Sequence, residues 1–203
     1  MRPFNKSTPP KIIEDNWIDW GIEYAKKRIE SNHSHEFRWA SVNSKPVNQH
    51  ILQDLLADTD SHCSYCDFSP LRGSSEKSID HFKPKSIEKF YLDVCKWENL
   101  YIACTFCQGA KKDSYNDLLL RPDEVEYNFY RYFFYDAETH EIEVNRHCTD
   151  DDKLRAITTI MIFQMNHPDQ TDSRRISYLH YYSTLESGTK PDIDLYSHRF
   201  IFE

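Results

Sequence analysis

Apolar residues recur at helical spacing in two stretches of the first sixty positions. Residues 15–31 have the pattern of an amphipathic helix that Asp15 or Asn16 can cap, and residues 48–58 have a shorter pattern of the same kind. Positions three or four apart lie on one face of a helix. The apolar faces predicted in this way are Trp17, Trp20, Tyr24 and Ile29 in the first helix and Ile51, Leu52, Leu55 and Leu56 in the second.

Shorter elements are predicted in the middle of the chain. Residues 78–82 have the pattern of a short strand, which Pro84 closes because proline has no N–H to donate to a neighbouring strand. A helix is expected to start near Cys107 and to carry Lys111 and Lys112.

The last third of the chain begins with strand formers and continues with helical patterns. Residues 129–135 are rich in aromatic side chains and residues 141–144 alternate, so a β-hairpin is predicted. One helix is expected from Asp150 until Pro168 ends it, and a last helix over residues 172–186. The first of these helices is expected to pack through Leu154, Ile157, Ile160, Met161 and Met165. The final residues, 192–203, show no pattern that places them.

Together these elements predict an α+β fold in one compact domain, which a chain of 203 residues suits. Residues 1–60 form a predicted N-terminal helical segment, residues 61–125 a central core, and residues 126–203 a C-terminal hairpin and helical segment. Hydrophobic residues make up 39% and only 4 glycines are present, so a packed core rather than disorder is expected. The absence of an apolar leader and of a long apolar run predicts a cytoplasmic location.

Charge is distributed unevenly along the chain. The net charge is −8, yet residues 77–112 hold seven lysines against four acidic residues. This distribution predicts a small positive patch on an acidic body. An acidic body repels nucleic acid in general, so a partner is expected to supply much of the grip on any such substrate.

Four of the six cysteines form two Cys-x-x-Cys pairs, Cys63 with Cys66 and Cys104 with Cys107. Disulfides are not expected in a reducing compartment. Two such turns present four thiolates to one Zn²⁺ ion at tetrahedral angles and leave no open position for a substrate. The predicted zinc is therefore structural.

The cysteine pairs also have interpretations other than a zinc site. The four could be unrelated buried residues, or one pair could be a redox motif, although a redox motif needs no second pair. His62 adjoins Cys63 and could serve as an alternate zinc ligand. Cys95 and Cys148 are expected to be small, inert, buried residues.

An Asp-His dipeptide, Asp80-His81, lies between the two cysteine pairs. A carboxylate suits Mg²⁺, and a neutral imidazole can take a proton from water near pH 7. Because neighbours on a strand point to opposite faces, a distortion before Pro84 is needed to bring both side chains to one cleft. Together they would form a hydrolytic pair, with the cation neutralising charge on a phosphate. An isolated Asp-His is more often a surface pair.

The order of these residues resembles the zinc-containing type of the HNH (ββα-metal) nuclease family. The matching positions are Cys63, Cys66, Asp80, His81, Phe82, Pro84, Asn99, Leu100, Cys104, Cys107 and Lys111. The resemblance implies a ββα-metal core with structural zinc, flanked by N-terminal helices and by a C-terminal β-hairpin and helices.

By this resemblance, His81 is the general base, Asp80 a ligand of catalytic Mg²⁺ or Mn²⁺, and Asn99 holds the loop that aims His81. Gln108 stands where the family has its last metal ligand, commonly Asn or His. Its added methylene moves the amide oxygen by more than an ångström, roughly one carbon–carbon bond. Asp113 is a possible substitute that is expected to face away.

Lysines around these motifs are candidates for contacts with the phosphates of nucleic acid, and the alternative is ordinary solvated charge. They are Lys83, Lys85, Lys111 and Lys112.

The stretches 78–85, 97–100 and 152–166 are more specifically similar to the PtuB family, the HNH subunits of Septu anti-phage systems, which also occur beside retrons. This resemblance implies a PtuA-like ATPase as partner, with a retron reverse transcriptase and its RNA–DNA hybrid as a further candidate. The expected function is a metal-dependent endonuclease that hydrolyses phosphodiester bonds within a defence complex. The alternatives are an RNase of the same fold, for example one that cleaves tRNA, and a non-catalytic zinc module that binds nucleic acid or protein.

Overall fold

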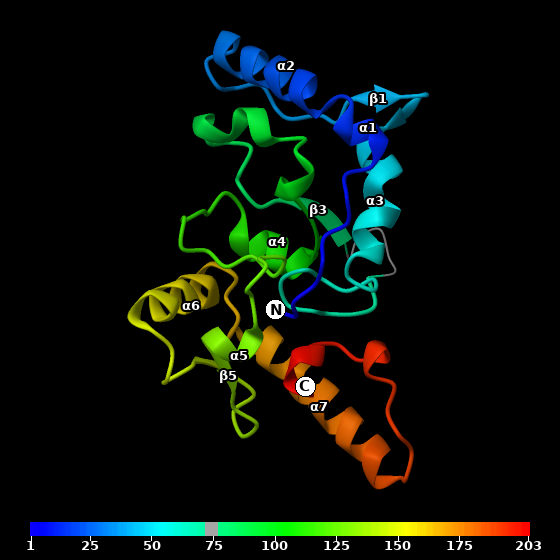
Figure 1. Cartoon of the computed structure of the whole chain (residues 1–203), viewed down its shortest axis with the longest axis vertical. Helices are drawn as coiled ribbons and strands as arrows, with labels where there is room; N and C mark the ends of the chain where they lie inside the picture. The colour runs from blue at the N-terminus through cyan, green and yellow to red at the C-terminus, as the bar shows by residue number, and fades with distance from the viewer. Residues whose placement is uncertain (72–76) are drawn as a thin grey trace.

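In the described residues, the strands form three separate antiparallel pairs; helices lie around the β3 pair, and the β1 and β5 hairpins lie towards the outside (Figure 1). The computed structural model describes residues 1–71 and 77–203; residues 72–76, within the predicted core segment, lie outside the described part. The α+β class is confirmed. The helices are α1 (Lys11–Glu14), α2 (Trp17–Glu30), α3 (Val47–Ala57), α4 (Thr105–Lys111), α5 (Phe129–Tyr132), α6 (Asp150–Ile162) and α7 (Pro168–Glu186). The strands are β1 (Ser41–Val42), β2 (Lys45–Pro46), β3 (Lys77–His81), β4 (Leu100–Cys104), β5 (Phe133–Tyr135) and β6 (Ile142–Val144).

Strands β3 and β4 and helix α4 occupy the middle of the molecule (Figure 1). The strands pair antiparallel, with Asp80 opposite Tyr101 and His81 opposite Leu100. Every residue of β4 is buried, which suits its nearly continuous apolar sequence. Helix α4 follows β4 without a break, because the Cys104 side chain accepts a hydrogen bond from the Cys107 N–H and so caps the helix.

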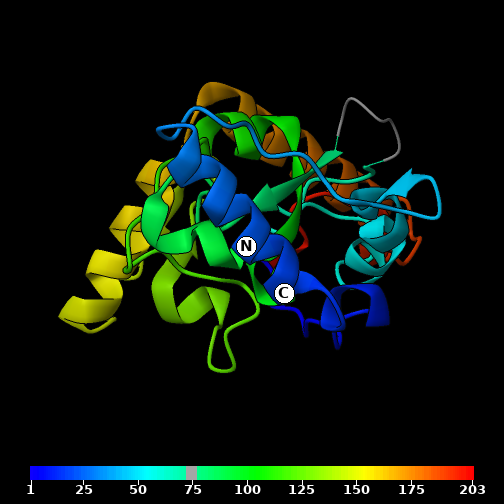
Figure 2. The same ribbon diagram turned by 90° about the horizontal axis from the view of Figure 1, so that it is seen from above.

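Helix α2 braces the connection between β3 and β4. It packs on η1, a 3₁₀ helix at Glu88–Asp93 (Figures 1 and 2). Gly21 makes this packing close, since a Cβ atom there would lie 2.4 Å from the carbonyl oxygen of Leu92. A glycine is therefore required at the point where helix and loop backbones touch.

The two predicted N-terminal helices are confirmed as α2 and α3. Ile51, Leu55 and Leu56 are buried as expected. In α2, however, Ile29 is exposed rather than packed. Asn16 precedes the helix without capping it, because its side-chain amide donates to the Ile12 carbonyl instead.

The C-terminal hairpin is confirmed by the β5–β6 pair, but its first arm is shorter than predicted. The side chain of Asn128 accepts a hydrogen bond from the Tyr130 N–H and so starts the short helix α5 at Phe129. The strand begins only at Phe133. Local capping has therefore overridden the strand preference of these aromatic residues.

Helix α6 packs through a different face from the predicted one, although Ile160 does pack against the core as expected. Its buried residues are Asp152, Ala156 and Thr159, and its exposed residues are Leu154, Ile157 and Met161. Polar contacts account for this orientation. The Asp152 carboxylate accepts two hydrogen bonds from Arg131, and Thr159 Oγ1 accepts one from the Leu120 N–H.

The boundary between α6 and α7 also differs from the prediction. Helix α6 ends at Ile162, so Met165 is buried outside it. Pro168 does not end a helix but begins α7, where its missing N–H costs nothing. His167 caps α7 by accepting a hydrogen bond from the Asp169 N–H.

The unplaced residues 192–203 return along α7 (Figure 1). Two 3₁₀ turns form there, η3 at Ile193–Leu195 and η4 at Arg199–Ile201. Arg199 is buried and binds the Asp67 carboxylate through its Nε and Nη2 atoms. His198 contacts the Cys66 carbonyl oxygen. Among the described residues, no helix is both long and apolar enough to cross a membrane.

The orientation of α6 predicts different costs for two substitutions. Met161→Gln should change the free energy of unfolding by no more than about 0.5 kcal/mol, because Met161 is 70% exposed. Phe163→Ala should cost about 3–5 kcal/mol, because Phe163 is 1% exposed and its ring stacks on Tyr65. Urea denaturation followed by circular dichroism measures both. A loss above about 1 kcal/mol for Met161→Gln would show that this face is packed in the free protein.

Candidate active site

Four buried cysteines form a cluster with the geometry of a metal site. The Sγ atoms of Cys63, Cys66, Cys104 and Cys107 all lie within 4.8 Å of one another. The first pair comes from the loop after α3 and the second from the junction of β4 and α4. In the described part of the chain, this is the only group of three or more His, Cys, Asp or Glu side chains placed to hold a metal ion.

The surroundings of the cluster fit a zinc ion. Backbone N–H groups donate to the sulfurs, from Cys104 to Cys63 Sγ at 3.3 Å and from Cys107 to Cys104 Sγ at 3.4 Å. The hydrogen bonds among the four sulfurs lower the pKa of the Cys104 thiol and raise the pKa of the Cys66 and Cys107 thiols, so the cluster shares its negative charge unevenly when no metal is bound. The four residues could hold zinc with a complete thiolate shell.

The alternative ligand His62 is excluded by its contacts. Its Nδ1 atom lies 2.7 Å from the Asp60 carbonyl oxygen, and its Nε2 atom lies 3.1 Å from that of Tyr196. Both ring nitrogens are therefore engaged with the backbone. Of the two remaining cysteines, Cys95 is buried as expected and burial raises its pKa to about 12, whereas Cys148 is partly exposed.

Asp80 is the next-to-last residue of β3, and two buried donors hold its carboxylate. The Tyr65 hydroxyl donates to Oδ2 at 2.7 Å, and the Lys111 ammonium lies 3.1 Å from the same oxygen. Lys111 also donates to the His81 carbonyl oxygen at 2.8 Å. The charge of Asp80 is thus compensated inside the protein.

Residues 35–40, here called the aromatic strap, form an extended segment between α2 and β1 (Figure 2), and two of its rings contact the His81 imidazole. The Trp39 ring stacks on the imidazole with 5.7 Å between ring centroids, and the Phe37 ring meets it edge-on at 5.0 Å. His81 is 6% exposed, and its Nε2 atom is buried without a hydrogen-bond partner. Burial, with the charges of Lys85 and Lys111, lowers the pKa of His81 to about 3.

Asp80 and His81 line one hollow of about 280 Å³ together with residues from α4 and the turn after it. Both residues of the dipeptide thus border the same space. Gln108 lines it from α4, and Asp113 lines it as well. The expectation that Asp113 faces away is therefore wrong. The chain turns at Lys112, whose φ of 46° ends the helix and redirects the following residue.

Asn99 is positioned to fix the loop that follows His81. Its Oδ1 atom accepts from the Lys83 N–H at 2.7 Å, and its Nδ2 atom donates to the carbonyl oxygens of Lys83 and Asp93. The Asn99 backbone carbonyl also accepts from the Phe82 N–H. One buried amide therefore ties the end of β3 to the end of η1.

The four lysines expected to contact phosphate occupy different environments. Lys85 and Lys112 line the hollow beside Asp80. Lys83 instead pairs with Asp93 at 3.3 Å. Lys111 is 0% exposed and has no surface to offer a phosphate, which corrects the expectation for this residue.

Sequence patterns did not identify Tyr65, Phe37 or Trp39 as part of this site. Tyr65 lies between the two cysteines of the first pair, and its position in the sequence does not distinguish it from a residue that only spaces the two thiols. The strap does carry a signal, because inward His35, Phe37 and Trp39 alternate with exposed Glu36 and Arg38. This period of two marks a half-buried extended segment even without a strand partner.

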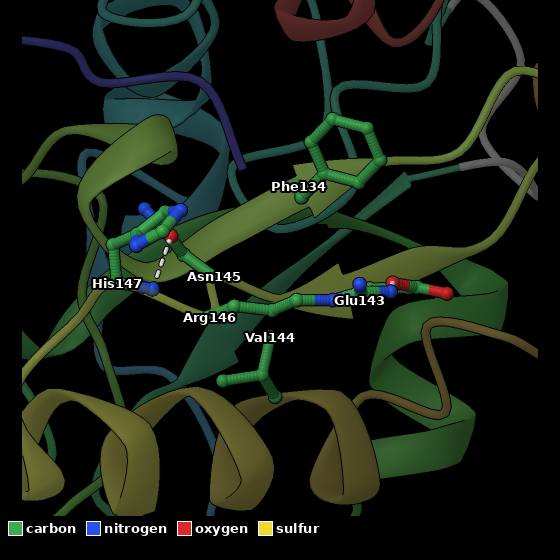
Figure 3. A pocket seen from close by; sticks show the side chains of 6 residues that line it. All are labelled: Phe134, Glu143, Val144, Asn145, Arg146 and His147. Carbon is green, nitrogen blue, oxygen red and sulfur yellow. Dashed lines mark hydrogen bonds and ion pairs between the residues drawn. The ribbon is translucent and has the colours of Figure 1, made fainter.

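A second hollow, of about 370 Å³, lies on the β5–β6 hairpin (Figure 3). Phe134 borders it on one strand. Across from Phe134, Glu143 and Arg146 form an ion pair with 3.5 Å between the Oε2 and Nη2 atoms. The Asn145 Oδ1 atom accepts from the His147 N–H, as the dashed line shows. None of the predicted site residues lines this hollow.

Zinc content should depend on the cluster cysteines alone. The purified protein is expected to carry about one zinc per chain, and Cys107→Ser should lose it together with a large part of the folding free energy. The control Cys148→Ser should keep both, since Cys148 lies outside the cluster. Elemental analysis and thermal melting measure the two quantities. Full zinc in Cys107→Ser would exclude this cluster as the zinc site.

The strap should control the titration of His81. In zinc-loaded protein without Mg²⁺, Trp39→Ala should raise the pKa of His81 from about 3 towards the ordinary value, because water then reaches the imidazole. Proton NMR of the imidazole measures this shift, and Arg38→Ala, outward on the same strap, is the control. An unchanged titration in Trp39→Ala would show that the strap does not desolvate His81.

The same shift has a consequence for stability. The folded pKa of His81 lies below the unfolded value, so protons bind the unfolded chain preferentially. The contribution of neutral His81 to the free energy of unfolding is therefore fully present above about pH 6.5, and it is lost as the pH falls towards about 3.

Comparison with known proteins does not assign the chain to a family. No protein-family model matches it, and no curated protein matches it. The functional conclusion therefore depends on the residues and contacts described above.

Proposed function

We propose that the protein is a metal-dependent endonuclease of the HNH type, with a structural zinc ion in the cysteine cluster. Two antiparallel strands followed directly by a helix support the proposal, since this is the order of elements in a ββα-metal core. Asp80 and His81 end the first strand, and Gln108 lies on the helix. All three line one hollow.

The observation that carries the proposal is the buried Nε2 atom of His81, which has no hydrogen-bond partner and belongs to a residue that lines the same hollow as Asp80. Buried polar atoms without partners are rare, and they often mark places where a ligand completes the hydrogen bonding. At pH 7 the imidazole is neutral, and for this nitrogen to take a proton from water efficiently, water would have to reach the ring and raise its pKa from about 3 towards the ordinary value. Asn99 would keep the loop after His81 in the orientation needed for this transfer.

The residues around the hollow also fit a hard cation. Asp80 offers a carboxylate oxygen, Gln108 an amide oxygen, and Asp113 a second carboxylate at the same hollow. When bound, Mg²⁺ or Mn²⁺ would neutralise charge on the phosphate and on the leaving oxygen. Lys85 and Lys112 would add contacts to flanking phosphates.

The resemblance to the PtuB family extends the proposal to a cellular role. In that role the protein is the effector subunit of an anti-phage complex with a PtuA-like ATPase, and a retron reverse transcriptase is a further partner to test. The net charge of −8 supports dependence on a partner, because it disfavours unassisted binding to nucleic acid. The exposed apolar residues of α6 and α7, such as Leu154, Met161 and Ile176, also suit a subunit surface.

One observation favours a different function. The described residues contain no second group of three or more His, Cys, Asp or Glu ligands, so any cation at the hollow needs Gln108 or oxygen atoms from outside the protein. A zinc module that binds nucleic acid without cleaving it would have this composition. Within nuclease chemistry, RNA remains an alternative substrate to DNA.

A cleavage assay separates these functions. The complex with its ATPase should cut plasmid DNA or tRNA in Mg²⁺ or Mn²⁺, and His81→Ala should slow cleavage by roughly 10²–10⁴-fold, the usual contribution of a general base. His147→Ala, a change at an exposed histidine on the hairpin, should cut at the parent rate. Equal cleavage by the parent complex and by His81→Ala would refute the catalytic role. Binding without cleavage by the parent complex would favour the non-catalytic module.

A further inference from the structure

We propose that Tyr65 and Lys111 are positioning residues that hold Asp80 by one oxygen and direct its other oxygen to the catalytic cation. The inference rests on the proposed function, because it specifies how the cation site at the hollow is built. Neither residue touches the hollow itself. Their effect on the cation would pass through Asp80.

The contacts on Asp80 are asymmetric. Tyr65 and Lys111 both bind Oδ2, at 2.7 and 3.1 Å. Among the described residues, no hydrogen bond or ion pair reaches Oδ1, although Asp80 is only 5% exposed. With two donors on one oxygen, the carboxylate cannot rotate without breaking a buried contact. The free oxygen is thereby fixed in direction on a residue that lines the hollow.

Both donors are themselves held rigidly. The Tyr65 ring is 1% exposed and stacks on Phe163, with 4.2 Å between ring centroids. The Lys111 ammonium is 0% exposed and also donates to the His81 carbonyl oxygen. Lys111 therefore contacts both residues of the Asp-His pair. A lysine at the surface is flexible and would not be held in one position.

The two donors are carried by the segments that the cysteines join. Tyr65 lies inside the turn between Cys63 and Cys66, and Lys111 lies one helical turn beyond Cys107 on α4. The cysteine cluster thus sets the spacing of the two groups that meet on Asp80. Zinc bound there would act on the cation site only by fixing the positions of Tyr65 and Lys111. Groups that hold a metal ligand commonly change the affinity for the metal by about 10–100-fold.

A direct test is a titration of the zinc-loaded protein with Mn²⁺, followed by paramagnetic broadening of the His81 imidazole resonances in NMR spectra. Tyr65→Phe should weaken Mn²⁺ binding by roughly 10-fold or more, because it frees Oδ2 on one side without changing side-chain shape. Tyr101→Phe is the matched control. It removes another buried hydroxyl that binds a carboxylate, on Asp123 at 2.8 Å, and should leave Mn²⁺ affinity unchanged.

Two further variants make the outcomes decisive. Asp80→Asn should abolish the broadening near His81, and Lys111→Arg, which keeps the positive charge but moves the donor, should weaken Mn²⁺ binding as Tyr65→Phe does. Zinc content and thermal melting show which variants are folded, and Tyr65→Phe alone decides the question if Lys111→Arg does not fold. Parent-like Mn²⁺ affinity in Tyr65→Phe, with binding lost in Asp80→Asn, overturns the positioning role and leaves the cation site intact. Unchanged binding in Asp80→Asn overturns both the positioning role and the proposed cation site.

Discussion

The arrangement of the whole centre depends on four sulfur atoms lying within 4.8 Å of one another. They join a loop after α3 to the start of α4, two parts of the chain separated by η1 and by both strands of the central pair. So small a sheet cannot hold its register by hydrogen bonds alone, because an isolated two-stranded pair is marginally stable in water. Zinc bound to the four sulfurs would supply the constraint that backbone pairing lacks. The cluster also caps α4 through Cys104, so the helix starts at a position set by these cysteines.

The Asp80–Lys111 pair shows what that constraint makes possible. Removing one partner from a buried ion pair typically costs about 3–5 kcal/mol, so such pairs persist only where the geometry is well defined. Here the lysine comes from α4 and the aspartate from β3, and both are almost fully buried. The pair is neutral overall, and what it contributes is a carboxylate whose position is fixed before any ligand arrives.

Elements with strong local signals were predicted well. Cysteine spacing located the cluster, and the patterns around Ile51 and Asp80 located α3 and β3. The errors arose where long-range polar contacts outweighed local preference. Arg131 and the Leu120 N–H draw the polar side of α6 inward, and no window of sequence around Leu154 contains that information.

The same limit applies to the site. The roles of Tyr65 and Trp39 come from ring contacts and hydrogen bonds to residues distant in sequence, which spacing alone does not reveal. Pro168 illustrates a different ambiguity. A proline can end one helix or begin the next, and only the cap at His167 distinguishes the two.

The aromatic strap has a consequence for how the protein moves. In the described structure, its ends are anchored by hydrogen bonds to the carbonyl oxygens of His35 and Ala40, but the backbone amides of residues 36–39 donate to no partner. Because these amides have no hydrogen bond to break, any protection from exchange with solvent deuterium comes from the packing of the Phe37 and Trp39 rings on His81 and Tyr24. Exchange at these amides therefore reports opening of the strap separately from unfolding of the core, and gives the timescale on which the imidazole becomes accessible.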